Sequence, residues 1–535
     1  MRNWVPLALL GICATGAFGQ AEQDKRQACA ALGSLSVPRT SFLQATMVEA
    51  GMLDLHQQQP DPLFFKKLPA FCRVVALSNP TADSNILIEV WLPLAGWNCK
   101  FMGLGNGGFA GSIEYQELAI AVLNGFAGGG TDTGHTGGAA DSGWALGHPE
   151  KVIDFGWRGV HAMTELSKTV VQSFYSGAPQ HSYFTGCSDG GREALMEAQR
   201  FPGDYDGILA GAPGYNWTSL FSRFAQIAAE LQSSPEKYLP ASKIPSLNQA
   251  VLAACHANEP GPYLADPRAC HFSPDALVCK GAETDACVTP AQAGSLKALY
   301  ASSNLKDGSL VYHGLLPGGE LGGNGWPVWI SGVKPGVSAA AVLAEGYFRN
   351  LVYANPSWEL KSFNLDRDLK AAQEKTAAAL DAVNPDLRPF KARGGKLILY
   401  QGWNDAASSP LATIDYYDSV EHTVGHEETG QFVRLFLVPG MQHCYRGPGP
   451  AEFGQFAPAF GASPDAAARN ITTALEQWVE KGIAPEQVIA RGNTETTAAG
   501  KADSFSQPIC AYPKAAVYKG SGDVKDAASY ACAEK

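Results

Sequence analysis

A serine between glycines is the strongest candidate for covalent chemistry in this chain. It lies in Gly186-Cys187-Ser188-Asp189-Gly190, which has the pattern G-x-S-x-G. In a nucleophile elbow of this pattern the serine occupies a strained turn between a strand and a helix, and the two glycines leave room for that turn. The pattern alone also arises by chance in a glycine-rich chain. Here residues 182–185 predict a strand and 191–200 a helix, so we expect Ser188 to be a nucleophile.

A serine hydroxyl needs a histidine base at neutral pH, and that histidine needs a carboxylate to orient it. In folds with a nucleophile elbow the acid and then the base follow the serine, each in a loop after a late strand. Asp405 follows a predicted strand at 396–400, and His443 follows one at 432–438. We therefore predict a triad of Ser188, Asp405 and His443. The other histidines are better explained as structural or exposed residues.

Cys187 and Cys444 provide an independent check, because each is the neighbour of a predicted triad member. If Ser188 and His443 are within hydrogen-bond reach, at about 3 Å, their neighbours can lie within the roughly 4.4–6.8 Å Cα separation that a disulfide needs. We predict a Cys187–Cys444 bond that fastens the base loop to the elbow. Cys187 as the nucleophile is the weaker alternative, because its side chain would point away from the cleft when Ser188 points in.

Two backbone N–H groups are expected to stabilise the oxyanion that forms when a serine attacks an ester. One belongs to Asp189, directly after the nucleophile. The other belongs to Gly107 or Gly108, in the glycine-rich loop 105–111 after a predicted strand at 101–104. A nucleotide-binding role for these glycines is weaker, because neither a long helix directly after them nor a phosphate-binding lysine is evident.

The elements that would position these residues alternate between strand and helix. Strands are predicted at 74–77, 86–92, 101–104, 182–185, 207–210, 396–400 and 432–438, and helices at 157–175, 191–200, 411–421 and 465–481. This order indicates a parallel sheet in an α/β fold. The alternation is lost between 219 and 387, which we interpret as an inserted lid domain. The core is then formed by 20–218 and 388–535.

Length, composition and charge limit the possible domain organisation, partners and cellular location of the protein. A chain of 535 residues is too long for one ordinary core, since single cores stop growing near roughly 250–300 residues. The net charge of −11 has no long run of one sign, which argues against nucleic acid or an anionic membrane as partner. Residues 1–19 have the early positive charge, short apolar stretch and small-x-small end of a signal peptide, so we expect a secreted or periplasmic protein.

The cysteines suggest a disulfide framework. The chain has 12 cysteines, and cleavage after Gly19 would remove Cys13 and leave an odd number, with one thiol left over. Short spacing suggests the pairs Cys255–Cys270, Cys279–Cys287 and Cys510–Cys532. Metal ligation is the weaker interpretation, because no cluster has the spacing of a zinc site.

These segments together resemble the tannase and feruloyl esterase family over nearly the whole chain. The resemblance lies in residues 105–111, 186–192, 205–208, 211–213, 402–405 and 439–444. It implies an α/β-hydrolase core with a large inserted lid, and hydrolysis of esters of aromatic acids through an acyl-enzyme on Ser188. It also implies the five pairs Cys29–Cys72, Cys187–Cys444, Cys255–Cys270, Cys279–Cys287 and Cys510–Cys532, which leaves Cys99 without a partner.

The resemblance also raises the question of a metal. Family members commonly bind calcium in the lid, through an Asp-rich loop between the cysteines that correspond to Cys255 and Cys270. Here that loop is short and lacks repeated aspartates, whereas calcium takes six to eight oxygen ligands. We therefore expect no metal and no other cofactor.

The expected partner is a small-molecule aryl ester. Lid aromatics that could stack on its ring are Trp326, Trp329, Tyr347 and Phe348, although packing within the lid explains each of them equally well. Other activities stay open: an aryl terephthalate monoester hydrolase, or a lipase or peptidase on the same fold. A catalytically inactive binding protein is the alternative from another class, and a complete triad argues against it.

Overall fold

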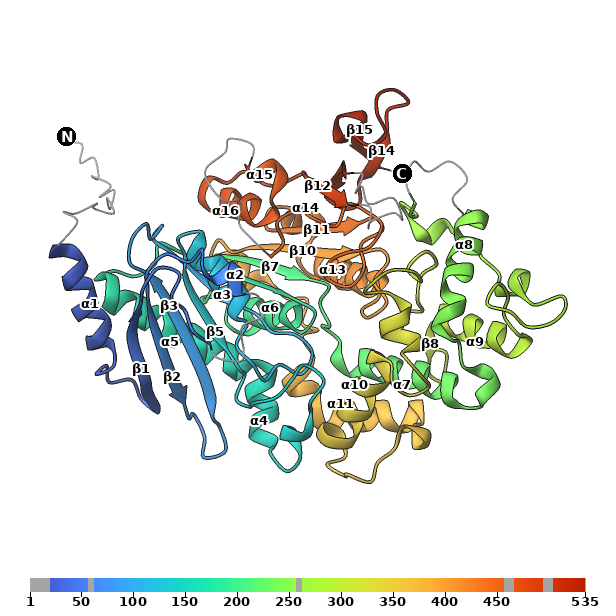
Figure 1. Ribbon diagram of the computed structural model, residues 1–535, viewed down its shortest axis with the longest axis horizontal. Helices are drawn as coiled ribbons and strands as arrows, with labels where there is room; N and C mark the ends of the chain where they lie inside the picture. The colour runs from blue at the N-terminus through green and yellow to red at the C-terminus, as the bar shows by residue number, and fades with distance from the viewer. Residues whose placement is uncertain (1–19, 56–61, 256–261, 457–465, 494–503, 535) are drawn as a thin grey trace.

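A nine-stranded mixed sheet forms the centre of the described molecule, in the order β1-β2-β3-β5-β4-β6-β7-β10-β11 (Figure 1). The structure is a computed structural model that describes residues 20–55, 62–255, 262–456, 466–493 and 504–534. The predicted signal peptide, 1–19, lies outside them. The strands of the sheet are β1 Thr40–Val48, β2 Phe71–Ser78, β3 Ile86–Pro93, β4 Lys100–Leu104, β5 Ala127–Thr131, β6 His181–Cys187, β7 Gly207–Gly211, β10 Lys396–Gly402 and β11 Val433–Val438.

The sheet is only partly parallel, which corrects the expectation of a parallel sheet. Strands β5, β4, β6, β7, β10 and β11 run parallel, whereas β1, β2, β3 and β5 pair antiparallel in turn. The segment 79–85 between β2 and β3 is long enough for a hairpin and too short for the crossover that parallel neighbours need. The parallel half of the sheet includes β6, which ends at the predicted elbow.

Strand β5 is not predicted by the sequence pattern, because its residues Ala-Gly-Gly-Gly-Thr lack the branched and aromatic side chains that favour strands. All five are buried. A Cβ at Gly129 would lie 2.8 Å from Met163 and 2.9 Å from Phe101. Glycine is therefore needed here so that the neighbouring helix can pack close to the strand.

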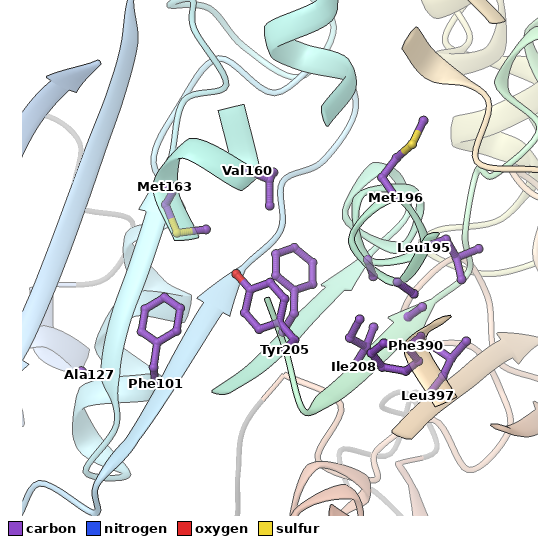
Figure 2. Packing of buried hydrophobic residues seen from close by; sticks show 14 of the residues in the cluster. Phe101, Ala127, Val160, Met163, Leu195, Met196, Tyr205, Ile208, Phe390 and Leu397 are labelled. Carbon is purple, nitrogen blue, oxygen red and sulfur yellow. The ribbon is translucent and has the colours of Figure 1, made fainter. Parts of the chain in front are cut away.

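Helices cover both faces of the parallel strands, because alternate residues of a strand point to opposite sides. On one face lie α5 (Gly159–Tyr175) and α6 (Asp189–Arg200), with Phe101 and Tyr205 packed against Val160 and Met163, as Figure 2 shows. On the other face α3 (Tyr115–Leu123) and α16 (Ile471–Lys481) pack on a second apolar cluster. The remaining helices of the core segments are α1 Gln20–Leu32, α2 Pro62–Phe65, α4 Pro149–Ile153, α12 Arg388–Ala392, α13 Pro410–Val424, α14 His426–Gly430 and α15 Ala466–Arg469.

Helices replace strands in most of the segment 219–387 that the sequence predicts as a lid. They are α7 Trp217–Gln232, α8 Ile244–Cys255, α9 Pro290–Tyr300, α10 Ala339–Gly346 and α11 Leu365–Leu380, with a short pair of strands, β8 Ser303–Asn304 and β9 Leu310–Tyr312. These elements lie beside the sheet, on the right of Figure 1. They build one apolar cluster of their own and share another with core residues such as Phe109 and Phe155. Across the described ranges, no helix has both the length and the hydropathy to cross a bilayer.

All five disulfides that the family resemblance implies are present: Cys29–Cys72, Cys187–Cys444, Cys255–Cys270, Cys279–Cys287 and Cys510–Cys532. The last of them links β13 (Ser504–Cys510) to β15 (Tyr530–Ala533), which pair with β12 (Gln487–Asn493) and β14 (Ala515–Tyr518) respectively. Cys99 is also disulfide-bonded in this structure of the full chain. The expectation of a leftover thiol concerns the chain cleaved after Gly19, and it stays a prediction.

The helix expected at 465–481 is interrupted. Asn470 separates α15 from α16 in an extended conformation, with φ −146° and ψ 115°, and its side chain accepts a hydrogen bond of 2.9 Å from the N–H of Thr473. Asparagine competes with helical hydrogen bonding and favours N-caps, so it begins a new helix instead of continuing the old one.

Replacing this cap tests its contribution to stability. We expect Asn470→Ala to lower the free energy of unfolding by about 1 kcal/mol, because an N–H of the first turn of α16 loses its acceptor. The thermal midpoint measures the change, with the exposed Asn304→Ala in β8 as a control that leaves it in place. An unchanged midpoint for Asn470→Ala would show that the cap does not stabilise the helix.

Candidate active site

The turn between β6 and α6 places Ser188 at the end of a parallel strand. Ser188 has φ 66° and ψ −118°, a left-handed conformation that costs energy for a residue with a side chain. A Cβ at Gly186 would lie 2.5 Å from the carbonyl oxygen of Gly190, and one at Gly190 would lie 2.8 Å from that of Asn106. Both glycines of the predicted elbow are therefore sterically required, as the pattern suggested.

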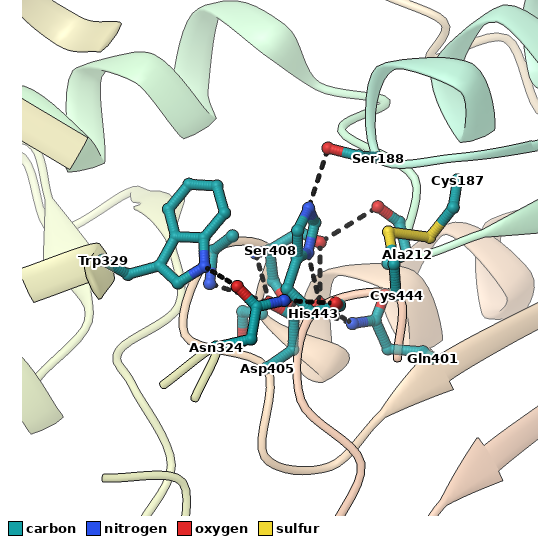
Figure 3. A network of polar contacts seen from close by, with 12 residues as sticks. Cys187, Ser188, Ala212, Asn324, Trp329, Gln401, Asp405, Ser408, His443 and Cys444 are labelled. Atoms are coloured by element: carbon teal, nitrogen blue, oxygen red, sulfur yellow. Dashed lines mark hydrogen bonds and ion pairs between the residues drawn. A yellow bond between two sulfur atoms is a disulfide. The ribbon is translucent and has the colours of Figure 1, made fainter. Parts of the chain in front are cut away.

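The three predicted triad residues lie in one chain of hydrogen bonds (Figure 3). His443 Nε2 lies 2.8 Å from Ser188 Oγ, and His443 Nδ1 lies 2.9 Å from Asp405 Oδ2. Both distances fit direct hydrogen bonds. A base that contacts the hydroxyl and a carboxylate that contacts the base is the arrangement that activates a serine for acyl transfer.

Asp405 is held by several donors at the start of the loop after β10. Its Oδ1 accepts from the N–H groups of Ala407, at 2.7 Å, and Ser408, at 3.0 Å. Its Oδ2 accepts from Gln401 Nε2 at 2.7 Å in addition to His443. These bonds fix the carboxylate in place and satisfy its charge, so His443 has one tautomer and one orientation, with the proton on Nδ1.

The loop that carries His443 is fastened to the elbow and to the lid. Cys187 and Cys444 are bonded, with their Cα atoms 5.9 Å apart. From the lid, Asn324 Nδ2 donates to the carbonyl oxygen of His443 at 2.6 Å, and Trp329 Nε1 donates to Asn324 Oδ1 at 3.1 Å. No pattern in the sequence marks Asn324, because it is a lone asparagine in a glycine-rich lid segment.

The glycine-rich loop lies beside the elbow, as an oxyanion hole requires. The N–H of Asn106 donates to Glu193 Oε2 of α6 at 2.8 Å, and the carbonyl oxygen of Asn106 accepts from the N–H of Gly190 at 2.8 Å. Gly107 and Gly108 line the same cavity as Ser188 and Asp189. Within the described residues the N–H groups of Asp189, Gly107 and Gly108 have no protein acceptor. They are therefore available to an oxyanion.

A cavity of about 460 Å³ opens over Ser188, between the core and the lid. Its lid wall is apolar and aromatic, with Trp217, Leu220, Phe221 and Phe224 from successive turns of α7, Val342 and Leu343 from α10, and Trp329. The volume falls within the range of about 300–1,000 Å³ that is typical of small-molecule sites. The periodic apolar residues of α7 were the available signal in the sequence for this wall.

Of the four lid aromatics predicted for substrate binding, only Trp329 lines the cavity. Its ring also meets that of His443 edge to face, with centroids 4.9 Å apart. Trp326 packs on Tyr300 inside the lid, and Tyr347 and Phe348 are fully buried in the cluster that the lid shares with the core. Packing within the protein explains these three residues.

The charged groups beneath the elbow are mostly paired. Asp189 and Arg192 are both buried and form an ion pair of 2.6 Å. Arg192 also donates to the carbonyl oxygens of Gly156 and Phe155. Burial, together with the nearby Asp189 carboxylate, raises the pKa of Glu193 well above its usual range, and its Oε2 accepts from the N–H of Asn106.

One group of residues in the described part of the chain has ligand atoms close enough to hold a metal. His161, Glu197 and Asp204 offer one atom each, all within 4.8 Å of one another. None of them lines the cavity over Ser188. His161 Nδ1 is already 2.7 Å from Asp204 Oδ2, and the ammonium of Lys168 donates to the carbonyl oxygen of Asp204. Because Lys168 supplies the positive charge here, we assign the group no metal.

The parallel sheet, the elbow and the Ser–His–Asp chain define a serine hydrolase of the α/β-hydrolase class. The chain belongs to one family of that class: the family model described as "Tannase and feruloyl esterase" matches residues 72–533. It is therefore a carboxylic ester hydrolase, as the sequence resemblance implied.

Individual relatives agree with this assignment. An uncharacterized esterase of Xanthomonas campestris pv. campestris is 38% identical, over 99% of this chain and 94% of its own. A probable feruloyl esterase B-1 of Aspergillus terreus is 31% identical over 92% of each chain. The crystal structure of feruloyl esterase B from Aspergillus oryzae superposes with a TM-score of 0.84 at 28% identity, covering 95% of this chain and all of that one.

The disulfide beside the triad offers a test of how the base is positioned. We expect Cys187→Ser with Cys444→Ser to lower kcat by about tenfold or more, because His443 loses the covalent link that keeps it opposite Ser188. Steady-state kinetics on an aryl methyl ester measures the effect at a temperature where far-ultraviolet circular dichroism shows a folded protein. The matched control is Cys279→Ser with Cys287→Ser, which removes a lid disulfide away from the cavity. Equal losses in the two double variants would contradict a role specific to the triad.

Proposed function

We propose that the protein hydrolyses esters of aromatic acids, of the feruloyl esterase or tannase type, through an acyl-enzyme on Ser188. The observation that carries this proposal is the cavity itself. The Ser188 hydroxyl and the unpaired N–H groups face a chamber whose lid wall is built from Trp217, Phe221 and Phe224. Aromatic walls of this kind bury a flat aryl ring favourably.

In the first half of the reaction, Ser188 Oγ attacks the ester carbonyl carbon and its proton moves to His443 Nε2. The oxyanion accepts hydrogen bonds from the N–H of Asp189 and of Gly107 or Gly108. The tetrahedral intermediate collapses when its bond to the alcohol oxygen breaks, and His443 Nε2 gives its proton to that oxygen. Asp405 stabilises the imidazolium throughout.

In the second half, water attacks the acyl carbon and gives a proton to His443 Nε2. The bond between the acyl carbon and Ser188 Oγ then breaks, and the serine oxygen takes the proton back from His443. The aromatic acid leaves and the enzyme returns to its starting state. The energetic gain comes from holding the nucleophile, base and oxyanion donors in place before the substrate arrives.

Removing the nucleophile tests the mechanism directly. We expect Ser188→Ala to lower kcat on methyl ferulate and methyl gallate by about 10⁴-fold or more, because no other group can form the acyl-enzyme. Intact-protein mass spectrometry after rapid quenching should show an acyl adduct in the parent enzyme and none in Ser188→Ala. The surface variant Ser233→Ala serves as the matched control and should keep full activity. Substantial turnover by Ser188→Ala would refute the proposal, and so would failure of the parent enzyme to hydrolyse aryl esters.

We also propose that the enzyme needs no metal. Residues 256–261, within the loop where relatives were expected to bind calcium, lie outside the described residues. In the described remainder of that loop the carboxylate is that of Asp266, which accepts from the N–H of Arg268 and forms an ion pair of 2.6 Å with its guanidinium. A carboxylate used in this way is a poor calcium ligand, and calcium requires several.

Chelation provides the corresponding measurement. We expect excess EDTA to leave both the thermal midpoint and the turnover of methyl ferulate unchanged, because a ligand that binds only the folded state would stabilise it and its removal would be detected. A drop in either quantity that added calcium restores would contradict a metal-free enzyme.

Export is part of the same proposal. The described chain has five disulfides. Disulfides are stable in oxidising compartments and rare in reducing ones. Together with the signal-peptide pattern of residues 1–19, they support a secreted or periplasmic enzyme that meets a small-molecule aryl ester outside the cytoplasm.

A further inference from the structure

The cavity over Ser188 is acidic as well as aromatic. Among the described residues that line it are Glu114 and Glu117, and none of them is a lysine or an arginine. The third lining carboxylate, Asp189, is neutralised by the buried Arg192. Glu114 and Glu117 have no such partner, since neither forms an ion pair within the described part of the chain. Their charge therefore acts on whatever occupies the cavity.

Both glutamates come from the segment that continues the oxyanion loop. Glu114 precedes α3 without capping it through its side chain, and Glu117 lies in the first turn of α3. The segment is fastened to the loop, because Asn106 Nδ2 donates to the carbonyl oxygen of Ser112 at 3.0 Å. The backbone segment that leads to the two glutamates is thus tied to the loop that carries the expected oxyanion donors.

Both glutamates are half-buried, and the described residues that line the cavity include no lysine or arginine. Burial and the nearby Glu117 raise the pKa of Glu114 to about 7, and burial raises the pKa of Glu117. A further buried carboxyl, Glu193 on α6, lies near Glu114. When these carboxyl groups are ionised, their repulsion of a nearby anion is stronger than it would be in bulk water.

We infer that Glu114 and Glu117 are specificity-determining residues, which admit neutral aryl esters to the cavity and exclude esters that carry a free carboxylate. The inference rests on the proposed function, since it concerns which esters reach Ser188. A substrate carboxylate in this cavity would lose its hydration, find no cation among the described lining residues and lie near two like charges. On this basis an aryl terephthalate monoester, which carries such a carboxylate, is a poor substrate.

Two esters of nearly equal size distinguish the effect of substrate charge from the effect of substrate shape on kcat/KM. Monomethyl terephthalate has a carboxylate opposite its ester, and methyl 4-carbamoylbenzoate has a neutral amide in the same position. At pH 8 the monoester is ionised and Glu114 is above its pKa of about 7. We expect the parent enzyme at this pH to have a kcat/KM for the amide at least about 100-fold above that for the carboxylate.

Glutamine substitutions remove the charge and keep the shape. We expect Glu114→Gln with Glu117→Gln to raise kcat/KM for monomethyl terephthalate by about tenfold or more and to change that for methyl 4-carbamoylbenzoate by less than about threefold. Each single substitution should give part of the gain. The exposed Glu427→Gln on α14 removes one charge far from the cavity and should leave both values in place. Turnover of the neutral ester reports that each variant is folded.

The possible results distinguish this inference from the proposed function. If the parent enzyme hydrolyses neither the amide nor methyl ferulate, the proposed function fails. If it hydrolyses the amide but treats the two terephthalate derivatives equally, or if the glutamine variants leave their ratio unchanged, the inference about Glu114 and Glu117 is overturned.

Discussion

A hydrogen bond of 2.8 Å between His443 Nε2 and Ser188 Oγ joins loops whose residues are 255 positions apart. Residues so far apart in the sequence are brought into contact only by tertiary structure, and several parts of the fold contribute. The parallel strands β6, β7, β10 and β11 bring the two loops to the same edge of the sheet. The disulfide between Cys187 and Cys444 then joins the immediate neighbours of the two catalytic side chains. Without this contact Ser188 would lack a base, and the oxyanion loop and the Asp405 carboxylate could not support acyl transfer.

The lid completes the catalytic arrangement as well as covering it. Asn324 donates to the backbone of the base loop, and Trp329 contacts both Asn324 and the His443 ring. The helix α7 contributes Ile227 and Leu231 to an apolar cluster inside the lid. It contributes Trp217, Phe221 and Phe224 to the cavity. Substrate binding and positioning of the base are therefore coupled through one inserted segment, and a change in the lid can affect both.

The carboxyl groups beneath the elbow and those at the cavity wall differ in whether they have a positively charged partner. The buried Asp189 is paired with Arg192, as a buried charge must be to avoid a large desolvation cost. Among the described residues Glu114 and Glu117 have no such partner, although burial opposes their ionisation. Two carboxyl groups without a positively charged partner lower the stability of the folded protein. Such a pair can be kept in a binding site when it discriminates among substrates.

The sequence by itself determined the chemistry of the site, because an elbow, the order of acid and base, and the cysteines beside them are local patterns that seldom occur together by chance. It also indicated the parallel strands β4, β6, β7, β10 and β11, but not β5, whose residues are mostly glycine. Only the tertiary structure decided which lid side chains line the cavity: Trp329 does, whereas Trp326, Tyr347 and Phe348 fill the interior. It likewise decided the antiparallel edge and the break at Asn470. The direction of a side chain and the partner of a strand depend on contacts with residues that are distant in the sequence. Local patterns of apolar and polar residues do not contain that information.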